Sequence, residues 1–300
     1  DAARLLRSGE ASVVVAGGME SMSNAPHLLP GSRSGTRYGT ITMVDHLAFD
    51  GLTAADLGIS MGELSEQYAQ RYPATRLEQD QIAAASHGRA HQAWVDGVMG
   101  AEVTAVTITS RRGEVVVDRD EGIREGTTLD VLAGLRPAFT AGGSITAGNS
   151  SPLSDGAAAT ILTTRARAHQ EGWEIFATLG APGQVAGPDP SLQEQPASAL
   201  SIALERQGWT AGSLGMVEIN EAFAAVSVCS TRALGVDPDK VNPHGGAIAL
   251  GHPIGASGAR LVVHTAHRIR AGKVDRAGVA LCGGGGQGEA LLLGGADGLG

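Results

Sequence analysis

Three segments in the C-terminal half carry residue types that could do acid–base chemistry. Asn220 follows the predicted strand 216–219, His252 lies in the Gly-rich run 251–258, and Cys282 precedes the glycines 283–288. An imidazole can act as a general base near neutral pH, a thiol can carry a proton, and open backbone N–H groups can bind an oxyanion. Each segment falls at a predicted strand-to-helix or strand-to-turn junction, where α/β folds place reactive groups.

Each signal also has a purely structural interpretation. Asn220-Glu221 could be a helix N-cap followed by an acidic first turn. A histidine at a helix start is more often structural, and a cysteine that ends a buried strand usually packs as a small hydrophobe. His244 and His252 could together bind a metal, but no third ligand lies at a suitable spacing, so we predict no metal site. The glycines favour a functional site because they let backbone and substrate approach closely.

Composition narrows the class of protein. The chain has 300 residues, 42% of them hydrophobic and 18% charged, with 44 glycines and 3% aromatics, which favours a tightly packed α/β fold of two or three domains. No apolar run approaches the roughly 18 residues of a membrane span. The net charge of −9 argues against a nucleic-acid-binding face but does not exclude an anionic ligand. Two cysteines make no disulfide framework, so we expect a cytoplasmic protein.

An internal repeat predicts two similar halves. A helix over 1–8 ends at Gly9, and a strand over 12–16, expected to be buried on both faces, ends in two glycines. The same order recurs as a helix over 259–270, a strand over 278–282 and the glycines that follow.

The two halves differ after the strand. The C-terminal copy turns at once into a second strand at 289–293, whereas the N-terminal equivalent lies at 157–162. We therefore predict an insertion at a hairpin, containing a helix that begins at the capping-box pattern Thr75–Glu78. The predicted domains are 1–22 with 154–168, an inserted loop domain at 23–153, and a C-terminal half at 169–300.

The motifs together resemble one family. Asn-Glu-Ala-Phe at 220–223, Gly-His-Pro-Ile-Gly-Ala-Ser-Gly at 251–258 and Cys-x-Gly-Gly-Gly-x-Gly at 282–288 resemble the signature set of the thiolases, coenzyme A-dependent acyltransferases. Further segments resemble the same family at 17–23, 60–62, 123–124, 135–139 and 146–151. The resemblance implies a five-layer αβαβα fold of two similar halves with an inserted coenzyme A-binding loop domain, its first strands missing.

The resemblance also implies catalytic roles. His252 would activate a nucleophilic cysteine and, with a water held by Asn220, form one oxyanion hole. Cys282 would move the α-proton of the second acyl-CoA, and the N–H of Gly284 would contribute to a second oxyanion hole. The reaction would be condensation of two acetyl-CoA to acetoacetyl-CoA, or cleavage of 3-ketoacyl-CoA by CoA, as in fatty acid metabolism.

For substrate binding, the resemblance assigns Ser151 to the pantetheine arm, Met61 and Phe223 to its apolar walls, and Arg124 to the nucleotide. Coenzyme A is then a substrate, and no separate cofactor is expected. Ser60 departs from the histidine of many short-chain members, which leaves the acyl-chain preference open. The expected partners are acyl-CoA, CoA and further copies of the chain in a homodimer or tetramer, with no nucleic acid and no membrane.

The nucleophile itself is expected upstream of Asp1, before a helix start equivalent to that of 251–258. Cys229 lies in the middle of an apolar helix, where a packing role is expected, so the chain alone is expected to be inactive. An alternative from another class is a catalytically dead thiolase-like CoA-binding protein. A nucleotide-binding loop is the third interpretation, because 283–288 fits G-x-G-x-x-G, but a strand follows the glycines where a helix should begin.

Overall fold

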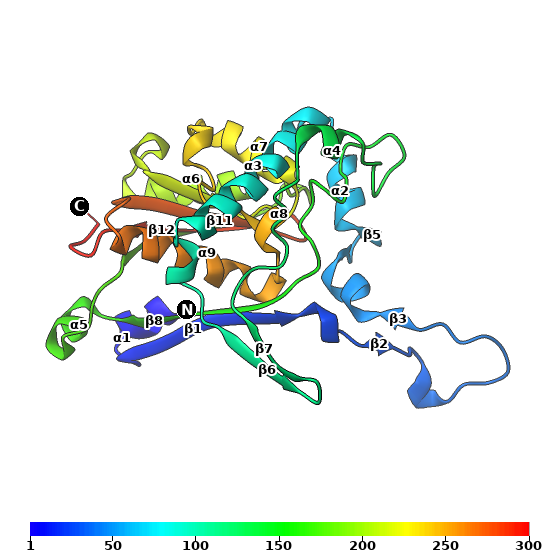
Figure 1. Cartoon of the computed structure of the whole chain (residues 1–300), viewed down its shortest axis with the longest axis horizontal. Helices are drawn as coiled ribbons and strands as arrows, with labels where there is room; N and C mark the ends of the chain where they lie inside the picture. The colour runs from blue at the N-terminus through cyan, green and yellow to red at the C-terminus, as the bar shows by residue number, and fades with distance from the viewer. Residues whose placement is uncertain (300) are drawn as a thin grey trace.

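The computed structural model describes residues 1–299, so residue 300 of the predicted C-terminal half lies outside it. Two sheets lie on either side of one long helix (Figure 1). The smaller sheet pairs β1 (Val13–Ser21) with β8 (Asp155–Thr163). The larger sheet has the order β10-β11-β12-β9, with β9 Thr178–Ala186, β10 Met216–Ile219, β11 Arg276–Gly283 and β12 Gln287–Gly294.

The helix α9 (Ile254–Arg270) packs between the sheets, and α6 (Gln195–Gln207) packs on the larger sheet. The layers therefore alternate between sheet and helix, as expected for the α/β class. The remaining helices are α1 Ala2–Ser8, α2 Met61–Gln67, α3 Arg76–Val95, α4 Leu129–Ala133, α5 Arg165–Glu171, α7 Ala224–Leu234 and α8 Ala247–Leu250. The short strands are β2 His27–Leu28, β3 Val44–Asp45, β4 Thr53–Ala54, β5 Ile59–Ser60, β6 Val106–Ser110 and β7 Gly113–Val117.

The predicted repeat is present in the strand pairing. The hairpin β11–β12 is antiparallel, and β1 pairs antiparallel with β8 in the same way. Two similar halves predict that both repeat strands lie centrally in their sheets, and this prediction is correct for β11, which has β10 as a parallel second neighbour. It is not met by β1, which pairs only with β8 within the part of the chain that the structure describes.

The ends of helices and strands were predicted correctly where they depend on short-range hydrogen bonds. The helix α1 ends at Gly9, whose φ of 78° is left-handed. The helix α3 begins after Thr75, which forms a complete capping box with Glu78. The strand β10 has the bounds predicted for the strand 216–219.

Two predicted boundaries were wrong, and for one reason. The first strand runs on through its glycines to Ser21, and α9 begins at Ile254 rather than near residue 259. A Cβ on Gly18 would lie 1.7 Å from the carbonyl oxygen of Gly255, and Glu20 accepts a hydrogen bond of 3.2 Å from the N–H of Gly255. These glycines therefore allow a strand and a helix to touch, and do not mark a turn or a loop.

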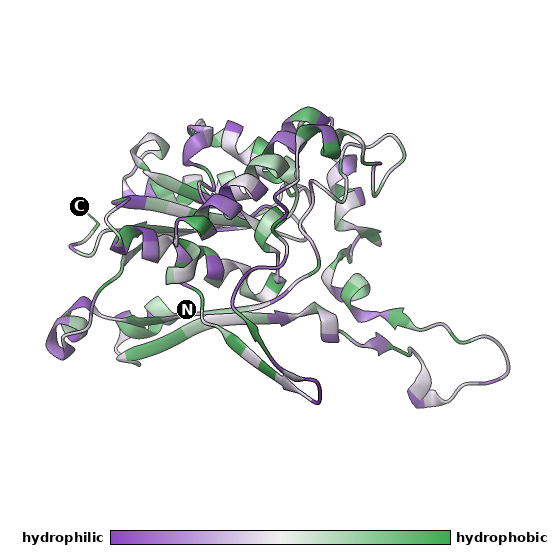
Figure 2. Ribbon diagram, in the orientation of Figure 1, coloured by the Kyte–Doolittle hydropathy of each residue, from purple (hydrophilic) through white to green (hydrophobic). Residues whose placement is uncertain are grey.

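The strand β1 is also not buried on both faces, as had been expected. Its residues alternate between exposed and half-buried. Val15 and Met19 are 70% and 73% exposed, and Ile161 of β8 is 72% exposed. The inner face of this sheet lies against α9, whereas its outer face is open in residues 1–299. Figure 2 shows the apolar colour in the first part of β1.

We expect Gly18→Ala to destabilise the protein by about 1–3 kcal/mol, because the added methyl must push β1 away from α9. The matched control is Gly88→Ala in α3, where an added Cβ meets nothing within 4 Å. That change should stabilise the fold by about 0.4–1 kcal/mol. Urea unfolding midpoints measure both effects, and equal midpoints for the two variants would contradict the close approach.

The segment between the paired strands leaves after Ser21 and returns at Asp155, which are register partners. Its helix α3 packs on α7 and α8 of the C-terminal half rather than on the sheet that the segment interrupts. The hairpins β2–β3 and β6–β7 extend away from the body (Figure 1). No helix in residues 1–299 is long and apolar enough to cross a membrane.

Candidate active site

The site begins where the parallel strands β10 and β11 end. Ile219 is the register partner of Ala280, and the N–H of Asn220 donates to the carbonyl oxygen of Ala280 over 2.9 Å. Asn220 and Cys282 therefore emerge at the same edge of the sheet. The N-cap interpretation of Asn220 is wrong, because α7 begins only at Ala224 with Phe223 in the capping position.

Asn220 faces His252. Its Nδ2 lies 3.4 Å from Nδ1 and 3.3 Å from Nε2 of the imidazole. A donor almost equidistant from both ring nitrogens lies over the ring, because an in-plane approach along that line would collide with Cε1. The side chain of Asn220 is fully buried, yet its Oδ1 has no hydrogen-bond partner. A buried amide oxygen needs a partner, and the bound water expected at Asn220 would supply one.

His252 is held at two points. Its backbone N–H donates to Ser154 Oγ over 3.1 Å, and its Nδ1 lies 2.6 Å from Ser257 Oγ. Burial, and to a lesser extent the positive charge of Arg260, lowers the pKa of His252 to about 4. The imidazole is therefore neutral at neutral pH and has a lone pair with which to accept a proton.

Cys282 is half-buried near the end of β11. Burial raises the pKa of its thiol to about 12. Such a thiol stays protonated and is a poor nucleophile, but it can give a proton to a strongly basic carbon, and its thiolate is a strong base. This raised pKa suits proton transfer better than acyl acceptance.

Gly284 follows in the turn between β11 and β12. A Cβ at this position would lie 2.7 Å from Cε of Met61, so the methionine lies directly against the glycine. The carbonyl oxygen of Gly284 accepts a hydrogen bond of 2.8 Å from Nε2 of Gln287, which braces the turn. The turn then bends through Gly285 and Gly286, both with positive φ.

Three of the four predicted coenzyme A-binding residues join this region. Ser151 donates through its hydroxyl to the carbonyl oxygen of Ala222 over 3.1 Å, which holds it beside Phe223. Met61 and Phe223 belong to the same apolar cluster as Cys282, and the ring of Phe223 meets that of Phe139 edge-to-face at 5.8 Å.

Arg124 is not brought to this cluster. Its side chain is exposed, and its backbone N–H donates to Nδ1 of His87 over 3.1 Å. The assignment of Arg124 to the nucleotide end of the ligand stays a prediction.

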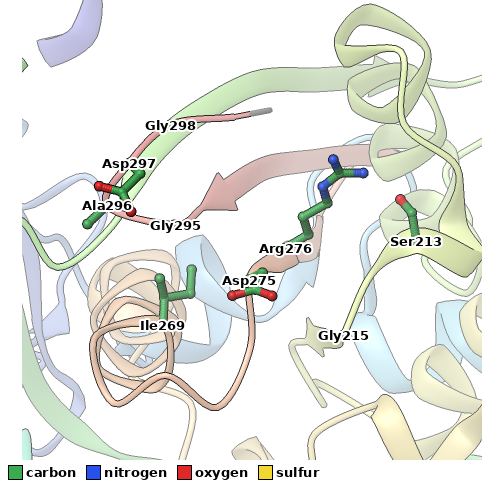
Figure 3. Close-up of a pocket in the computed structure, with 9 residues that line it drawn as sticks. All are labelled: Ser213, Gly215, Ile269, Asp275, Arg276, Gly295, Ala296, Asp297 and Gly298. Atoms are coloured by element: carbon green, nitrogen blue, oxygen red, sulfur yellow. The ribbon is translucent and has the colours of Figure 1, made fainter.

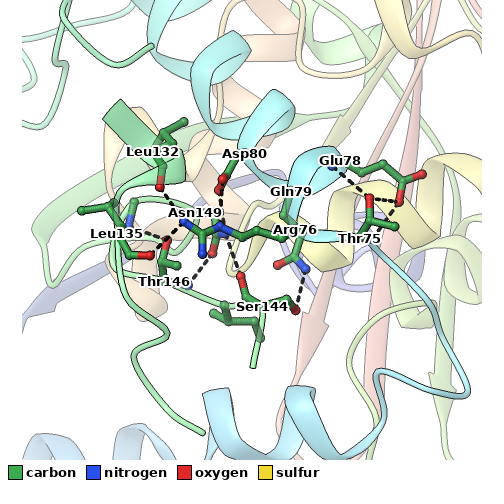
Figure 4. A network of polar contacts seen from close by, with 12 residues as sticks. Thr75, Arg76, Glu78, Gln79, Asp80, Leu132, Leu135, Ser144, Thr146 and Asn149 are labelled. Atoms are coloured by element: carbon green, nitrogen blue, oxygen red, sulfur yellow. Dashed lines mark hydrogen bonds and ion pairs between the residues drawn. The ribbon is translucent and has the colours of Figure 1, made fainter. Parts of the chain in front are cut away.

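A polar network fixes the segment that carries Ser151 (Figure 4). Asn149 donates to Asp80 of α3 over 3.0 Å and accepts from the N–H of Thr146 over 2.8 Å. Arg76 also donates to Asp80, over 2.8 Å, and Gln79 donates to Ser144. Since α3 packs on α7 and α8, the network ties the segment that carries Ser151 to the C-terminal half.

Glu221 is a site residue whose function the sequence did not indicate. Its buried carboxylate accepts hydrogen bonds from Ser86 Oγ (2.6 Å), Asn242 Nδ2 (2.9 Å) and the N–H of Ile248 (3.2 Å). Burial raises its pKa. The side chain joins α3, the turn after β10 and the loop before His252. A glutamate read as the acidic first turn of a helix offers no signal of such a role.

Ser60 is occupied as a helix cap. Its hydroxyl donates to Glu63 over 2.8 Å and accepts from the N–H of Glu63 over 3.2 Å, so the capping box of α2 is complete. The side chain is therefore held by its own helix.

The two histidines considered as metal ligands do not meet. His244 Nδ1 lies 3.1 Å from Nε2 of His264, whose Nδ1 is paired with Glu102 at 2.9 Å. His252 contacts Asn220 and Ser257 instead. Among residues 1–299, no group of three or more histidine, cysteine or acidic side chains could hold a metal ion.

A hollow of about 700 Å³ lies elsewhere (Figure 3). It is lined by Gly215 before β10, Arg276 at the start of β11 and Gly295 after β12. These residues mark the opposite end of the sheet from Asn220 and Cys282. The hollow is therefore not the candidate active site.

The fold and the site define an α/β protein with a neutral histidine, a buried amide and a weakly acidic thiol at a Gly-rich sheet edge. Residues 1–166 match the family described as "Thiolase, N-terminal domain", and residues 173–294 match "Thiolase, C-terminal domain". The chain belongs to the thiolase family.

Relatives and solved structures agree. The "Probable acetyl-CoA acetyltransferase" of Mycolicibacterium smegmatis is 54% identical over 291 residues, 97% of this chain and 75% of that protein. The acetyl-CoA acetyltransferase of Pseudomonas aeruginosa is 45% identical, over 97% of this chain and 74% of that protein.

Among solved structures, the Bacillus anthracis acetyl-CoA acetyltransferase superposes with a TM-score of 0.92 at 36% identity, covering 98% of this chain and 74% of that one. Human mitochondrial 3-ketoacyl-CoA thiolase also gives 0.92, at 35% identity, over 97% of this chain and 74% of that one. The chain is thus similar to both along nearly its whole length.

Proposed function

We propose that the protein is a thiolase-type acyltransferase that condenses two acetyl-CoA to acetoacetyl-CoA, or cleaves 3-ketoacyl-CoA with CoA. The observation that carries this is the meeting of His252 and Asn220 at the sheet edge where Cys282 emerges. Family membership and the names of the similar proteins support the same reaction class.

The site residues take complementary parts in this reaction. Neutral His252 removes the proton of the acyl-accepting thiol, and its protonated Nε2 then donates to the thioester oxygen together with a water on Asn220. Cys282 takes the α-proton of the second acyl-CoA in condensation and returns it in cleavage. The N–H of Gly284 stabilises the second oxyanion. Acid–base transfer contributes roughly 10²–10⁴-fold to such a rate.

Acyl-CoA and CoA are the proposed ligands, held along Ser151, Met61 and Phe223 with Arg124 towards the nucleotide. Assembly into a dimer or tetramer and a cytoplasmic location belong to the same proposal. Coenzyme A enters as a substrate, and the steps above use side chains, a backbone N–H group and a water on Asn220.

A second candidate is a thiolase-like CoA-binding protein without turnover. It is favoured by the two thiols of residues 1–299, neither of which is poised to accept an acyl group. Cys229 is buried in α7, where burial raises its pKa to about 11, and Cys282 is raised to about 12. Turnover therefore needs an acyl-accepting thiol other than these two.

The test is an acetoacetyl-CoA cleavage assay with acyl-enzyme detection by mass spectrometry. We expect the 300-residue chain to bind CoA without forming a thioester, and an enzyme that also carries the acyl-accepting thiol to turn over. Cys229→Ala is the control and should behave like the parent in both the cleavage assay and the acyl-enzyme measurement. A thioester on Cys229 or Cys282 would contradict this assignment. Absence of cleavage by the thiol-bearing enzyme would favour the binding protein.

A further inference from the structure

The side chain that orients His252 is Ser257, on the first turn of α9. We propose that Ser257 is a positioning residue that holds His252 as the Nδ1–H tautomer and so leaves Nε2 free as the base. This inference rests on the proposed function for its purpose, but its geometry stands without it.

The contacts of Ser257 are few and short. Its side chain is 1% exposed. Its Oγ lies 2.6 Å from His252 Nδ1 and 2.9 Å from the carbonyl oxygen of Pro253, one helical turn earlier. Among residues 1–299, the only other side chain bonded to the ring is that of Asn220, whose Nδ2 is a donor and lies over the ring. Ser257 is therefore the one in-plane partner that the described residues offer to Nδ1.

The number of available protons decides which atom donates in the hydrogen bond between Ser257 Oγ and His252 Nδ1. A hydroxyl carries one proton, and the carbonyl oxygen of Pro253 can only accept. When Ser257 donates to Pro253, its lone pairs are left for a donor, so Nδ1 of the imidazole carries the hydrogen and Nε2 does not. With the opposite direction, the basic lone pair would point at Ser257 and be lost to the reaction.

The same arrangement serves the charged state. When Nε2 takes a proton from the acyl-accepting thiol, the thiol becomes a thiolate and both ring nitrogens become donors. The Nδ1–H still donates to Ser257, and nothing needs to rotate. Loss of the hydroxyl would leave a buried N–H without an acceptor in both states, which is costly in a buried site.

A second serine gives a matched control. Ser154 also binds His252, but through the backbone N–H, at 3.1 Å. Its hydroxyl donates to the carbonyl oxygen of Pro152 over 2.9 Å, much as Ser257 donates to Pro253. Removing Ser154 should loosen the loop without changing which ring nitrogen is protonated.

The experiment is nitrogen NMR of the protein labelled with ¹⁵N-histidine, with the ring signals of residue 252 assigned by their loss in His252→Gln. We expect the parent and Ser154→Ala to show protonated Nδ1 and unprotonated Nε2 at neutral pH. In Ser257→Ala this single tautomer should be lost. A parent with protonated Nε2, an unchanged Ser257→Ala, or an equal change in Ser154→Ala would each overturn the proposal.

Kinetics separate this inference from the proposed function. In the enzyme that carries the acyl-accepting thiol, Ser257→Ala should lower kcat roughly 10- to 100-fold with little change in KM, as loss of an orienting partner does. If the enzyme shows the expected NMR pattern but no acyl transfer, the proposed function is wrong and the tautomer assignment still holds. Unchanged kcat in Ser257→Ala would overturn the positioning role.

Discussion

Replacing Cys282 with serine is expected to abolish carbon–carbon bond formation while leaving acyl-enzyme formation nearly intact. The thiol lies near the end of β11 beside the Gly284 turn, and its raised pKa of about 12 suits exchange of a proton with carbon. A serine hydroxyl is a much weaker acid, so the loss should reach roughly 10²–10⁴-fold in the condensation rate.

The two half-reactions can be measured separately in the enzyme that carries the acyl-accepting thiol. Acyl-enzyme formation is followed by the release of CoA from acetyl-CoA, and condensation by the appearance of acetoacetyl-CoA. Cys229→Ser is the matched control, since this second buried thiol lies in α7 against the carbonyl oxygen of Tyr72. Equal losses of both half-reactions in Cys282→Ser would reassign Cys282 to acyl transfer.

Replacing His252 with glutamine should slow acyl-enzyme formation, because the imidazole is proposed as the base for the acyl-accepting thiol and as a donor to one oxyanion. The loss of the base is worth roughly 10²–10⁴-fold, and the loss of an oxyanion donor roughly 10²–10³-fold. Single-turnover rates with acetyl-CoA measure the first step. A variant slow only in condensation would contradict the role of His252 as the base for the thiol.

The pKa of His252 also gives a stability signature. Burial lowers it from 6.5 to about 4, so between these values the unfolded chain binds a proton that the folded chain does not. The contribution of His252 to stability is therefore present above about pH 6.5 and is lost as pH falls towards 4. In His252→Gln, the free energy of unfolding should fall less steeply over this window, and an identical slope would argue against a neutral buried imidazole.

Much of the fold and of the site was predictable because the signals are local. The Gly9 cap, the Thr75–Glu78 capping box and the bounds of β10 depend on hydrogen bonds between residues close in sequence. The three motifs around Asn220, His252 and Cys282 could be read as ends of elements, and family resemblance supplied their proposed roles. The repeat indicated the paired hairpins because each half encodes its own strands.

Other features were decided only when distant elements packed together. Gly18 and Gly255 look like a turn and a loop in sequence, but β1 and α9 touch through them. Asn220 looks like a helix cap, whereas the register of β10 with β11 and the docking of α9 turn it towards His252.

The polar partners of the site were also decided only by tertiary packing. Ser257 gave no signal as the partner of the imidazole, and Glu221 gave none as the buried link between α3 and the loops of the site. Both roles depend on hydrogen bonds that exist only after burial removes water and forces each polar atom to find a neighbour. The chain by itself therefore determined which chemical groups are present and where its elements end, and the tertiary structure decided which of those groups meet.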